Sequence, residues 1–358
     1  MHVLDKIFRV KFSITWYTTI MGAAKSYLMG ERKENKDMLE GWPRRNRVEK
    51  GKFPFTNLCI EGGGARGVAL GGTIRALDEY GILSQLKQFV GSSAGAIGCT
   101  MIAAGYGAHE VHELNMNTDF NLFMDDSWGV VRDSNRFISR YGMCPGDFFQ
   151  TWIEDLLLKK IGIASVTFQQ LFNVTGNDLR ITSVCVSDDK LVIFTHKSHP
   201  YMQVSLAVRA SMSIPGVFCP VEIDGKLYVD GGLSDNYPLD TFDDEFVDDH
   251  RTLGLKLMGD EETRGSRIHV KPLPTNNVVE YYGAIISHMC NSIERLKVNK
   301  KYWPRTIQVP TGTIGTTEFT MSQSRKLAAV DVAYKSTVKQ LEYFKEHREF
   351  KSTDANSQ

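Results

Sequence analysis

The sequence lacks the features that mark several protein classes. None of its six cysteines stands in a C-x-x-C pair, so we expect buried thiols and neither a disulfide framework nor a zinc site. No D-x-[DN]-x-[DN]-G loop and no His/Cys cluster is present, and we expect no metal and no cofactor. The 42 basic and 42 acidic residues give a net charge of zero, which argues against nucleic acid as a partner.

Long apolar runs are also scarce. The longest uncharged stretch near the N-terminus, Phe12 to Ala24, is shorter than the roughly 20 residues that a membrane-spanning helix needs. It lacks a convincing small-residue cleavage site, so we expect no secretory signal. The sequon at Asn173 should then stay unglycosylated, and the expected location is the cytoplasm.

Three glycine-rich runs contain the candidate catalytic residues, and the second of them contains a candidate nucleophile. Ser93 is the central residue of a G-x-S-x-G motif, between an apolar segment that ends at Val90 and a helix of small residues. A serine on such a strand–turn–helix junction projects its hydroxyl outward, and the helix N-terminus offers amide donors to a developing negative charge. The alternative is a glycine-rich turn with a capping serine. The motif comprises Gly91, Ser92, Ser93, Ala94 and Gly95, and Ser92 is expected to point away from Ser93.

The first run lies between a short apolar strand at 57–60 and a helix at 68–80. It also satisfies G-x-G-x-x-G, but a dinucleotide site needs an acidic residue after the next strand, and that strand runs directly into Gly91. Bare glycine amides suit an oxyanion hole instead. Arg66 either attracts an anionic head group or only pairs locally. The run comprises Gly62, Gly63, Gly64, Ala65, Arg66 and Gly67.

The third run contains a candidate general base. Lys226 to Val229 reads as a strand that leads into Asp230, Gly231 and Gly232. A serine needs a base within hydrogen-bond reach to become nucleophilic. Asp230 supplies one if the sheet brings it beside Ser93.

These motifs, in this order, resemble the patatin-like phospholipase family. The resemblance covers residues 56–242 and includes the stretch Ala210 to Phe218, which resembles the family's second signature, and it extends more faintly over 303–347. It implies an α/β fold, a three-layer α/β/α sandwich with a mostly parallel central sheet. It also implies a Ser-Asp dyad without histidine, in which Ser93 is the nucleophile and Asp230 the base, with the glycine loop as oxyanion hole.

The resemblance further implies a phospholipase A type activity on acyl esters of membrane lipids. Neutral glycerides, lysolipids and acyl thioesters are alternative substrates for the same dyad. A conventional triad would have the order Ser, acid, His, and His269 is the histidine that keeps this alternative open. A third alternative is an inactive scaffold that only binds membranes, against which the intact Ser93, Asp230 and glycine loop count.

Four segments are expected: a basic extension at 1–54, a catalytic core at 55–242, its C-terminal part at 243–347 and a flexible tail at 348–358. Residues 1–52 hold twelve Lys/Arg and six Asp/Glu, a net charge of +6. Apolar residues recur there at helical spacing, so the extension either lies on an anionic membrane, making the protein peripheral, or packs on the core. Asp119 to Gly142 is either a flap over a lipid site or an ordinary loop. Further strands are expected at 179–186, 191–195, 252–258 and 306–309, and further helices at 204–212, 277–299 and 322–346.

Overall fold

This computed structural model describes residues 53–124, 139–243, 250–259 and 302–347, with Phe137, Ile285, His288, Met289, Ser292 and Ile293. All of them belong to the unit Arg47–Gln358. The extension at 1–52, the tail at 348–358 and almost all of the helix expected at 277–299 lie outside the described residues.

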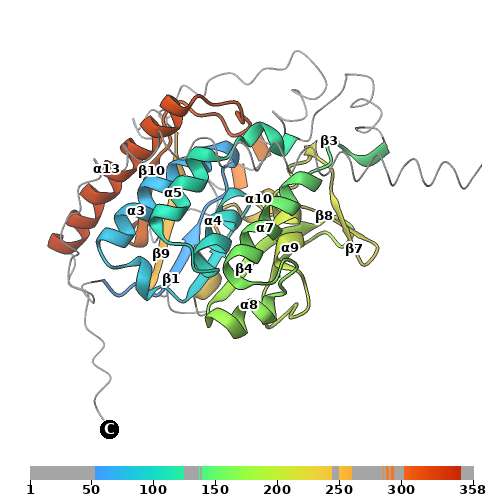
Figure 1. Ribbon diagram of the computed structural model, residues 1–358, viewed down its shortest axis with the longest axis horizontal. Coiled ribbons are helices and arrows are strands. Elements are labelled where there is room, and N and C mark those ends of the chain that lie inside the picture. The colour runs from blue at the N-terminus through green and yellow to red at the C-terminus, as the bar shows by residue number, and fades with distance from the viewer. Residues whose placement is uncertain are drawn as a thin grey trace, which may run out of the picture. The chain divides into compact units, whose positions relative to one another are not determined.

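A central sheet organises the fold (Figure 1). Its strands follow the order β10-β9-β1-β2-β4-β8-β7, and β5 pairs with β4. The pairs β10–β9, β9–β1, β1–β2 and β2–β4 are parallel, whereas β8, β7 and β5 join through antiparallel pairs. The strands are β1 (Asn57–Ile60), β2 (Gln88–Gly91), β4 (Asp178–Cys185), β5 (Lys190–Phe194), β7 (Val221–Ile223), β8 (Lys226–Asp230), β9 (Thr252–Met258) and β10 (Thr306–Pro310).

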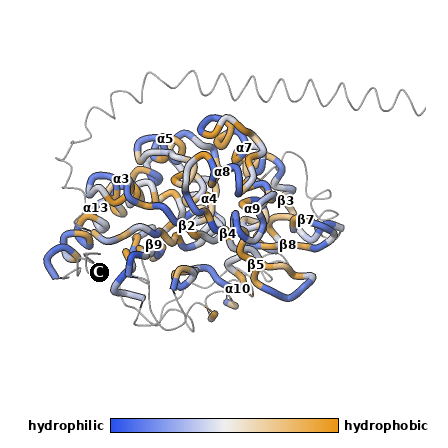
Figure 2. The backbone as a smooth tube through the Cα atoms, turned by 90° about the horizontal axis from the view of Figure 1, so that it is seen from below, coloured by the Kyte–Doolittle hydropathy of each residue, from blue (hydrophilic) through white to orange (hydrophobic). Residues whose placement is uncertain are grey.

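Helices lie on both faces of this sheet. Figure 2 shows α3, α4, α8, α9 and α13 on one side of the strands and α10 on the other. The first group encloses the larger apolar core. A smaller buried cluster around Tyr237, Leu239 and Tyr302 lies on the opposite face. The α-helices are α3 (Leu70–Glu79), α4 (Ala94–Ala103), α5 (Ala108–Asn117), α7 (Asp147–Ile161), α8 (Phe168–Thr175), α9 (Val204–Ser211), α10 (Gly232–Asp235) and α13 (Gln323–His347).

Shorter elements complete the described chain. Five 3-10 helices are η1 (Gly64–Ala69), η2 (Leu83–Gln85), η3 (Phe120–Met124), η4 (Leu239–Phe242) and η5 (Trp303–Arg305). Two short parallel strands, β3 (Gly142–Cys144) and β6 (Gly216–Phe218), form a separate sheet.

The topology places the three glycine-rich runs near one another. β1 and β2 are parallel neighbours joined through α3, and their last residues, Ile60 and Gly91, are paired. The next strand, β4, pairs Ile181 with Gly91 and, two residues further along the same edge, Ser183 with Asp230, because β5 occupies its other edge at both positions. Because β2 runs parallel and β8 antiparallel to β4 along this edge, the two strands approach each other end to end, and their last residues, Gly91 and Asp230, lie close together.

The predicted α/β class with a mostly parallel central sheet is confirmed. The strand at 252–258 and the helices at 94–104 and 204–212 agree with the structure within a residue at each end. The helix expected from Val68 is wrong in its first turn, which continues the 3-10 helix η1 up to Ala69 before α3 begins. Such tight turns are common where a helix starts from a constrained loop.

Candidate active site

Ser93 occupies a strained turn between β2 and α4. Its backbone has φ 51° and ψ −125°, which is unusual for a residue other than glycine. Its amide donates to Ser211 Oγ at 2.9 Å, and only 3% of the residue is exposed. The turn therefore fixes the Ser93 side chain at the N-terminus of α4 through backbone geometry and one buried partner.

The motif glycines let β1, β2 and α4 approach one another closely. A Cβ at Gly95 would lie 2.1 Å from the carbonyl oxygen of Ile60 in β1, and a Cβ at Gly91 would lie 2.4 Å from the carbonyl oxygen of Gly95. Both distances are far below a normal contact. Ser92 between them is completely buried, and its hydroxyl has no hydrogen-bond partner among the described residues.

Asp230 ends β8 and is 6% exposed. Its Oδ1 accepts a hydrogen bond from the amide of Gly232 at 2.7 Å. Burial raises the pKa of the carboxyl from 3.8 to about 6, while hydrogen bonds from the Ser93 side chain and the Gly232 amide lower it. Asp230 is therefore a carboxylate that ionises near neutral pH and faces Ser93.

The Ser93 hydroxyl has two acceptors within reach but a single proton. It hydrogen-bonds to Met212 Sδ at 3.5 Å, and the Asp230 carboxyl lies near enough for the Ser93 side chain to lower its pKa. A carboxylate is a far stronger acceptor than a thioether. Once Asp230 is ionised, the proton is directed to the carboxylate, which is the arrangement that general-base activation of a hydroxyl requires.

The segment before Asp230 is held by a buried arginine that the sequence analysis did not single out. Arg209 in α9 donates to Ser213 Oγ at 2.6 Å, to the Cys219 carbonyl at 2.9 Å and to the Pro145 carbonyl. Ser213 in turn accepts the Asp230 amide through its carbonyl at 3.0 Å. Arg209 thus fixes the loop on which the base rests.

The glycine loop after β1 offers two open amides. The Gly62 amide donates to the Asn236 carbonyl at 3.0 Å, that of Ala65 to the Thr316 carbonyl at 2.8 Å, and that of Arg66 to the Gly63 carbonyl at 3.1 Å. The amides of Gly63 and Gly64 have no acceptor among the described residues. Within the run Gly62 to Gly67 predicted from the sequence, the amides of Gly63 and Gly64 are therefore the candidate hydrogen-bond donors to an oxyanion.

Two other segments fix the shape of this loop. Gly64 has φ +54°, and a Cβ there would lie 2.1 Å from the Thr316 carbonyl oxygen. Asn236 Nδ2 donates to the Gly62 carbonyl at 3.1 Å, so that Asn236 pairs with both polar groups of Gly62. Thr316 and Asn236 lie more than 170 residues from the loop in sequence, and nothing local to either residue predicts this contact.

A buried ion pair supports the start of the loop. Glu61, 2% exposed, accepts Lys256 Nζ at 2.7 Å through one oxygen and the Leu257 amide at 2.6 Å through the other. A charged residue between an apolar strand and a glycine run is the sequence signal that would have indicated such a role. Arg66, by contrast, is half-buried, and its Nε is buried without a partner among the described residues.

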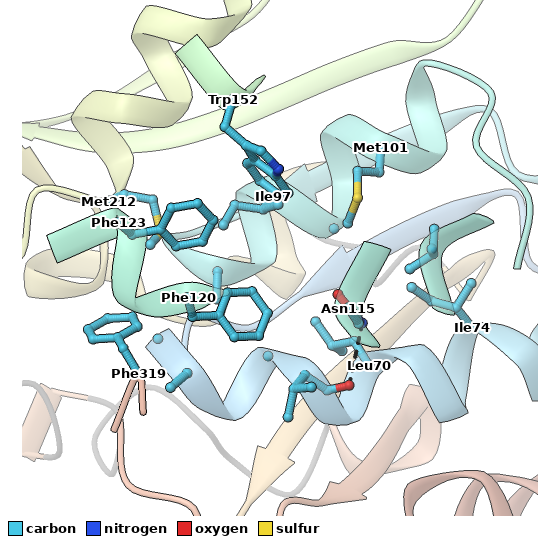
Figure 3. A pocket seen from close by; sticks show the side chains of 17 residues that line it. Leu70, Ile74, Ile97, Met101, Asn115, Phe120, Phe123, Trp152, Met212 and Phe319 are labelled. Atoms are coloured by element: carbon cyan, nitrogen blue, oxygen red, sulfur yellow. Dashed lines mark hydrogen bonds between the residues drawn. The ribbon is translucent and has the colours of Figure 1, made fainter. Parts of the chain in front are cut away.

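An apolar pocket opens beside Ser93 and the loop (Figure 3). It holds about 560 Å³ of empty space, part of which is open to solvent. Figure 3 shows the rings of Phe120, Phe123 and Trp152 gathered near Ile97 of α4, and all four side chains line the pocket. The lining residues are Gly64, Ala65, Gly67, Val68, Leu70, Ile74, Ala94, Ile97, Gly98, Met101, Val111, Asn115, Phe120, Phe123, Trp152, Met212 and Phe319. Since Ala94 follows Ser93 in the chain and Met212 Sδ lies 3.5 Å from its hydroxyl, the pocket lies next to the serine.

No histidine among the described residues hydrogen-bonds to Ser93 or Asp230, and His269 lies outside them. The described part of the chain contains no group of three or more His, Cys, Asp or Glu side chains arranged to hold a metal ion. Its five described cysteines are all buried and free of disulfide bonds. None of the helices in the described ranges is long and apolar enough to cross a membrane.

Comparison with known proteins agrees with this geometry. The family model for patatin-like phospholipases matches residues 58–243. The chain belongs to this family. Members of the patatin-like family are serine acyl hydrolases that act on lipids, and the matched segment contains all three glycine-rich runs.

Individual relatives extend the likeness beyond that segment. An uncharacterized protein of Acanthamoeba polyphaga mimivirus is 28% identical over 287 residues, which cover 80% of this chain and 93% of the relative. A probable lipid hydrolase of Invertebrate iridescent virus 6 is 28% identical over 52% of this chain and 62% of its own. The crystal structure of VipD from Legionella pneumophila superposes with a TM-score of 0.60 at 16% identity, over 81% of this chain and 67% of VipD, and so shares its fold.

Proposed function

We propose that this patatin-like protein is a phospholipase A type acyl hydrolase that uses Ser93 as nucleophile and Asp230 as general base. The observation that carries the proposal is the buried Asp230 carboxyl, whose pKa the Ser93 side chain lowers, together with the strained turn of Ser93 and the apolar pocket next to it. A pocket lined by aliphatic and aromatic side chains suits the acyl chain of a lipid.

The reaction begins when ionised Asp230 accepts the Ser93 proton and Oγ bonds to the ester carbonyl carbon. The carbonyl oxygen becomes an oxyanion that accepts hydrogen bonds from the open amides of Gly63 and Gly64. The carbon–oxygen bond to the leaving alcohol then breaks, and Asp230 returns its proton to that alcohol. Water attacks the acyl-serine by the same route, with Asp230 again as base, and releases the fatty acid and free Ser93.

A histidine is not needed in this scheme, because the Asp230 carboxylate itself accepts the Ser93 proton. A catalytic triad that includes His269 is the alternative mechanism, and mutation of Asp230 and of His269 distinguishes it from the dyad. Glycerides, lysolipids and thioesters would follow the same steps, because the dyad acts on the acyl carbonyl that all of these substrates share.

We infer in addition that the protein acts at a membrane surface as a peripheral protein. Leu122 in η3 is 49% exposed and lies between Phe120 and Phe123, both of which line the pocket. An apolar side chain at this position favours contact with lipid next to the pocket wall. The basic extension at 1–52 would add attraction to anionic lipids, and the expected location is the cytoplasmic face of a membrane.

Labelling with a fluorophosphonate probe tests the nucleophile. Ser93→Ala should abolish both labelling and hydrolysis of a soluble ester, whereas Ser92→Ala, at the fully buried neighbouring serine, should retain both. Labelling that survives Ser93→Ala would refute the assignment. If the wild type is active, it is incubated with vesicles of phosphatidylcholine, lysophosphatidylcholine, triacylglycerol and an acyl thioester. The released products then identify the substrate class. A wild type that takes neither probe nor ester would be the inactive scaffold.

A further inference from the structure

A buried lysine links the C-terminal helix to the wall of the pocket. Lys326 lies in the first turn of α13, outside the segment that the family model matches, and is 6% exposed. Its Nζ lies 2.6 Å from the carbonyl oxygen of Thr118, 3.3 Å from that of Asn115 and 3.5 Å from that of Met116. Three backbone carbonyls therefore surround one ammonium group.

These carbonyls belong to the C-terminal end of α5. The last carbonyls of a helix have no partners within it and form the negative end of its dipole. An ammonium group at this position satisfies them and stabilises the helix end. Burial lowers the pKa of Lys326, and Asp119 nearby opposes this effect by favouring the charged form.

The same ammonium group also contacts the pocket wall. Lys326 Nζ lies 4.4 Å from the ring centroid of Phe120, the distance of a cation–π contact. Phe120 lines the pocket together with Asn115, whose carbonyl is one of the three acceptors. The Phe120 ring packs against Phe123 at 5.6 Å, and Phe123 packs against Trp152 at 5.0 Å, so the position of Phe120 affects this whole aromatic wall (Figure 3).

The segment that leads into α13 also contacts the pocket wall. Phe319 lines the pocket, and the Thr320 hydroxyl hydrogen-bonds to Asn121 of η3. Lys326 therefore joins α5 and η3 to α13 at the point where these elements meet around the pocket.

We propose that Lys326 is a positioning residue that sets the acyl-chain selectivity of the pocket, by anchoring the end of α5 and holding Phe120 in the pocket wall. The inference rests on the proposed function of the pocket as an acyl site. Without the ammonium group, the α5 carbonyls lose their donor and Phe120 loses its cation. The wall then no longer has one defined position, and a long chain, which contacts more of the wall than a short one, is affected more.

The test compares hydrolysis of p-nitrophenyl butyrate and laurate by the wild type, Lys326→Met and Lys326→Arg. Lys326→Met should lower the laurate-to-butyrate ratio of kcat/KM by about tenfold, through a higher KM for laurate, which is the size of effect expected for lost contacts in an apolar pocket. Lys326→Arg keeps a cation that can donate to carbonyls and should restore most of the ratio. Lys335→Met, at an exposed position of the same helix, is the matched control and should leave the ratio unchanged.

If Lys326→Met lowers kcat/KM equally for both esters, or changes neither value, the laurate-to-butyrate ratio stays the same. Lys326 would then only stabilise the fold, and the inference would be overturned. If Lys326→Met does not fold, Phe120→Leu takes its place, since it removes the ring but leaves the carbonyl contacts, and the same fall in the ratio is expected. Binding of a fluorescent long-chain fatty acid separates the two proposals. In a Ser93→Ala background, the Lys326→Met change should weaken binding about tenfold. If the Lys326→Met change weakens fatty-acid binding but the wild type hydrolyses no ester, the proposed hydrolase function is refuted and the inference about Lys326 still holds.

Discussion

Replacing Asp230 with asparagine should lower activity and raise stability at the same time. Burial raises the pKa of this carboxyl from 3.8 to about 6, which means that the folded protein disfavours the ionised form. A difference of this size corresponds to about 3 kcal/mol of folding free energy once the group is ionised in both states. Asparagine keeps the shape and the Gly232 contact through its carbonyl oxygen but carries no charge.

The effect on stability depends on pH in a defined direction. Below the unfolded-state pKa the carboxyl is protonated in both states, and the asparagine variant has little advantage. As the pH rises from the unfolded-state pKa through the folded-state value of about 6, the folded wild type must hold a buried carboxylate. Its free energy of unfolding therefore falls relative to that of the variant. The variant should therefore be more stable by about 3 kcal/mol at neutral pH and by much less near pH 4.

The effect on activity has the opposite sign. A general base works only when it is ionised, so wild-type kcat/KM should rise with pH to a plateau and be half-maximal near the Asp230 pKa of about 6. The variant should lose at least about 10²-fold in turnover, as expected when a general base is removed. Asp224→Asn, on the exposed turn between β7 and β8, is the matched control and should change neither property.

Urea unfolding at both pH values and hydrolysis of a soluble ester across the pH range measure the two effects. An Asp230→Asn protein that is less stable than the wild type at neutral pH would contradict the argument from burial. A variant that stays active while His269→Ala is inactive would show that the enzyme uses a triad.

Three further predictions concern packing, charge and the extension. Gly95→Ala should abolish probe labelling and destabilise the fold, since its Cβ would lie 2.1 Å from a backbone carbonyl of β1, whereas Gly107→Ala, with no atom closer than 3.9 Å, should be neutral in labelling and thermal melting. Lys256→Met should cost about 3–5 kcal/mol in unfolding free energy by removing the cation from the buried Glu61 carboxylate, and adding Glu61→Gln should recover part of the loss. Deleting residues 1–40 should weaken sedimentation with anionic vesicles in a salt-dependent way more than it slows hydrolysis of a soluble ester, and equal losses would indicate that the extension packs on the core.

Local patterns were sufficient to predict much of the fold. The alternation of short apolar segments with helical patterns between residues 57 and 104 predicts two parallel strands and two helices, because adjacent parallel strands need a crossover between them. The G-x-S-x-G spacing predicts a sharp turn at Ser93, and the structure has positive φ there. Such features depend on residues close together in the chain, and a single sequence records them directly.

Other contacts could not be predicted because their partners are distant in sequence. The Glu61–Lys256 pair, the Ala65 amide on the Thr316 carbonyl and the Lys326 contacts with α5 each join residues about 200 or more positions apart. Backbone carbonyls have no sequence signature, since every residue has one. The weak C-terminal resemblance gave no indication that α13 reaches the pocket wall.

By itself, the sequence determined the order of the elements, the sharp turn at Ser93 and the residue types available for acyl transfer, because these follow from local sterics and side-chain chemistry. The tertiary structure decided that Asp230 lies beside Ser93, through the shared partner strand β4, and that the Gly63 and Gly64 amides have no acceptor in the part of the chain that the structure describes. It also decided the pKa of Asp230, since desolvation depends on what surrounds a carboxyl and not on its neighbours in the chain.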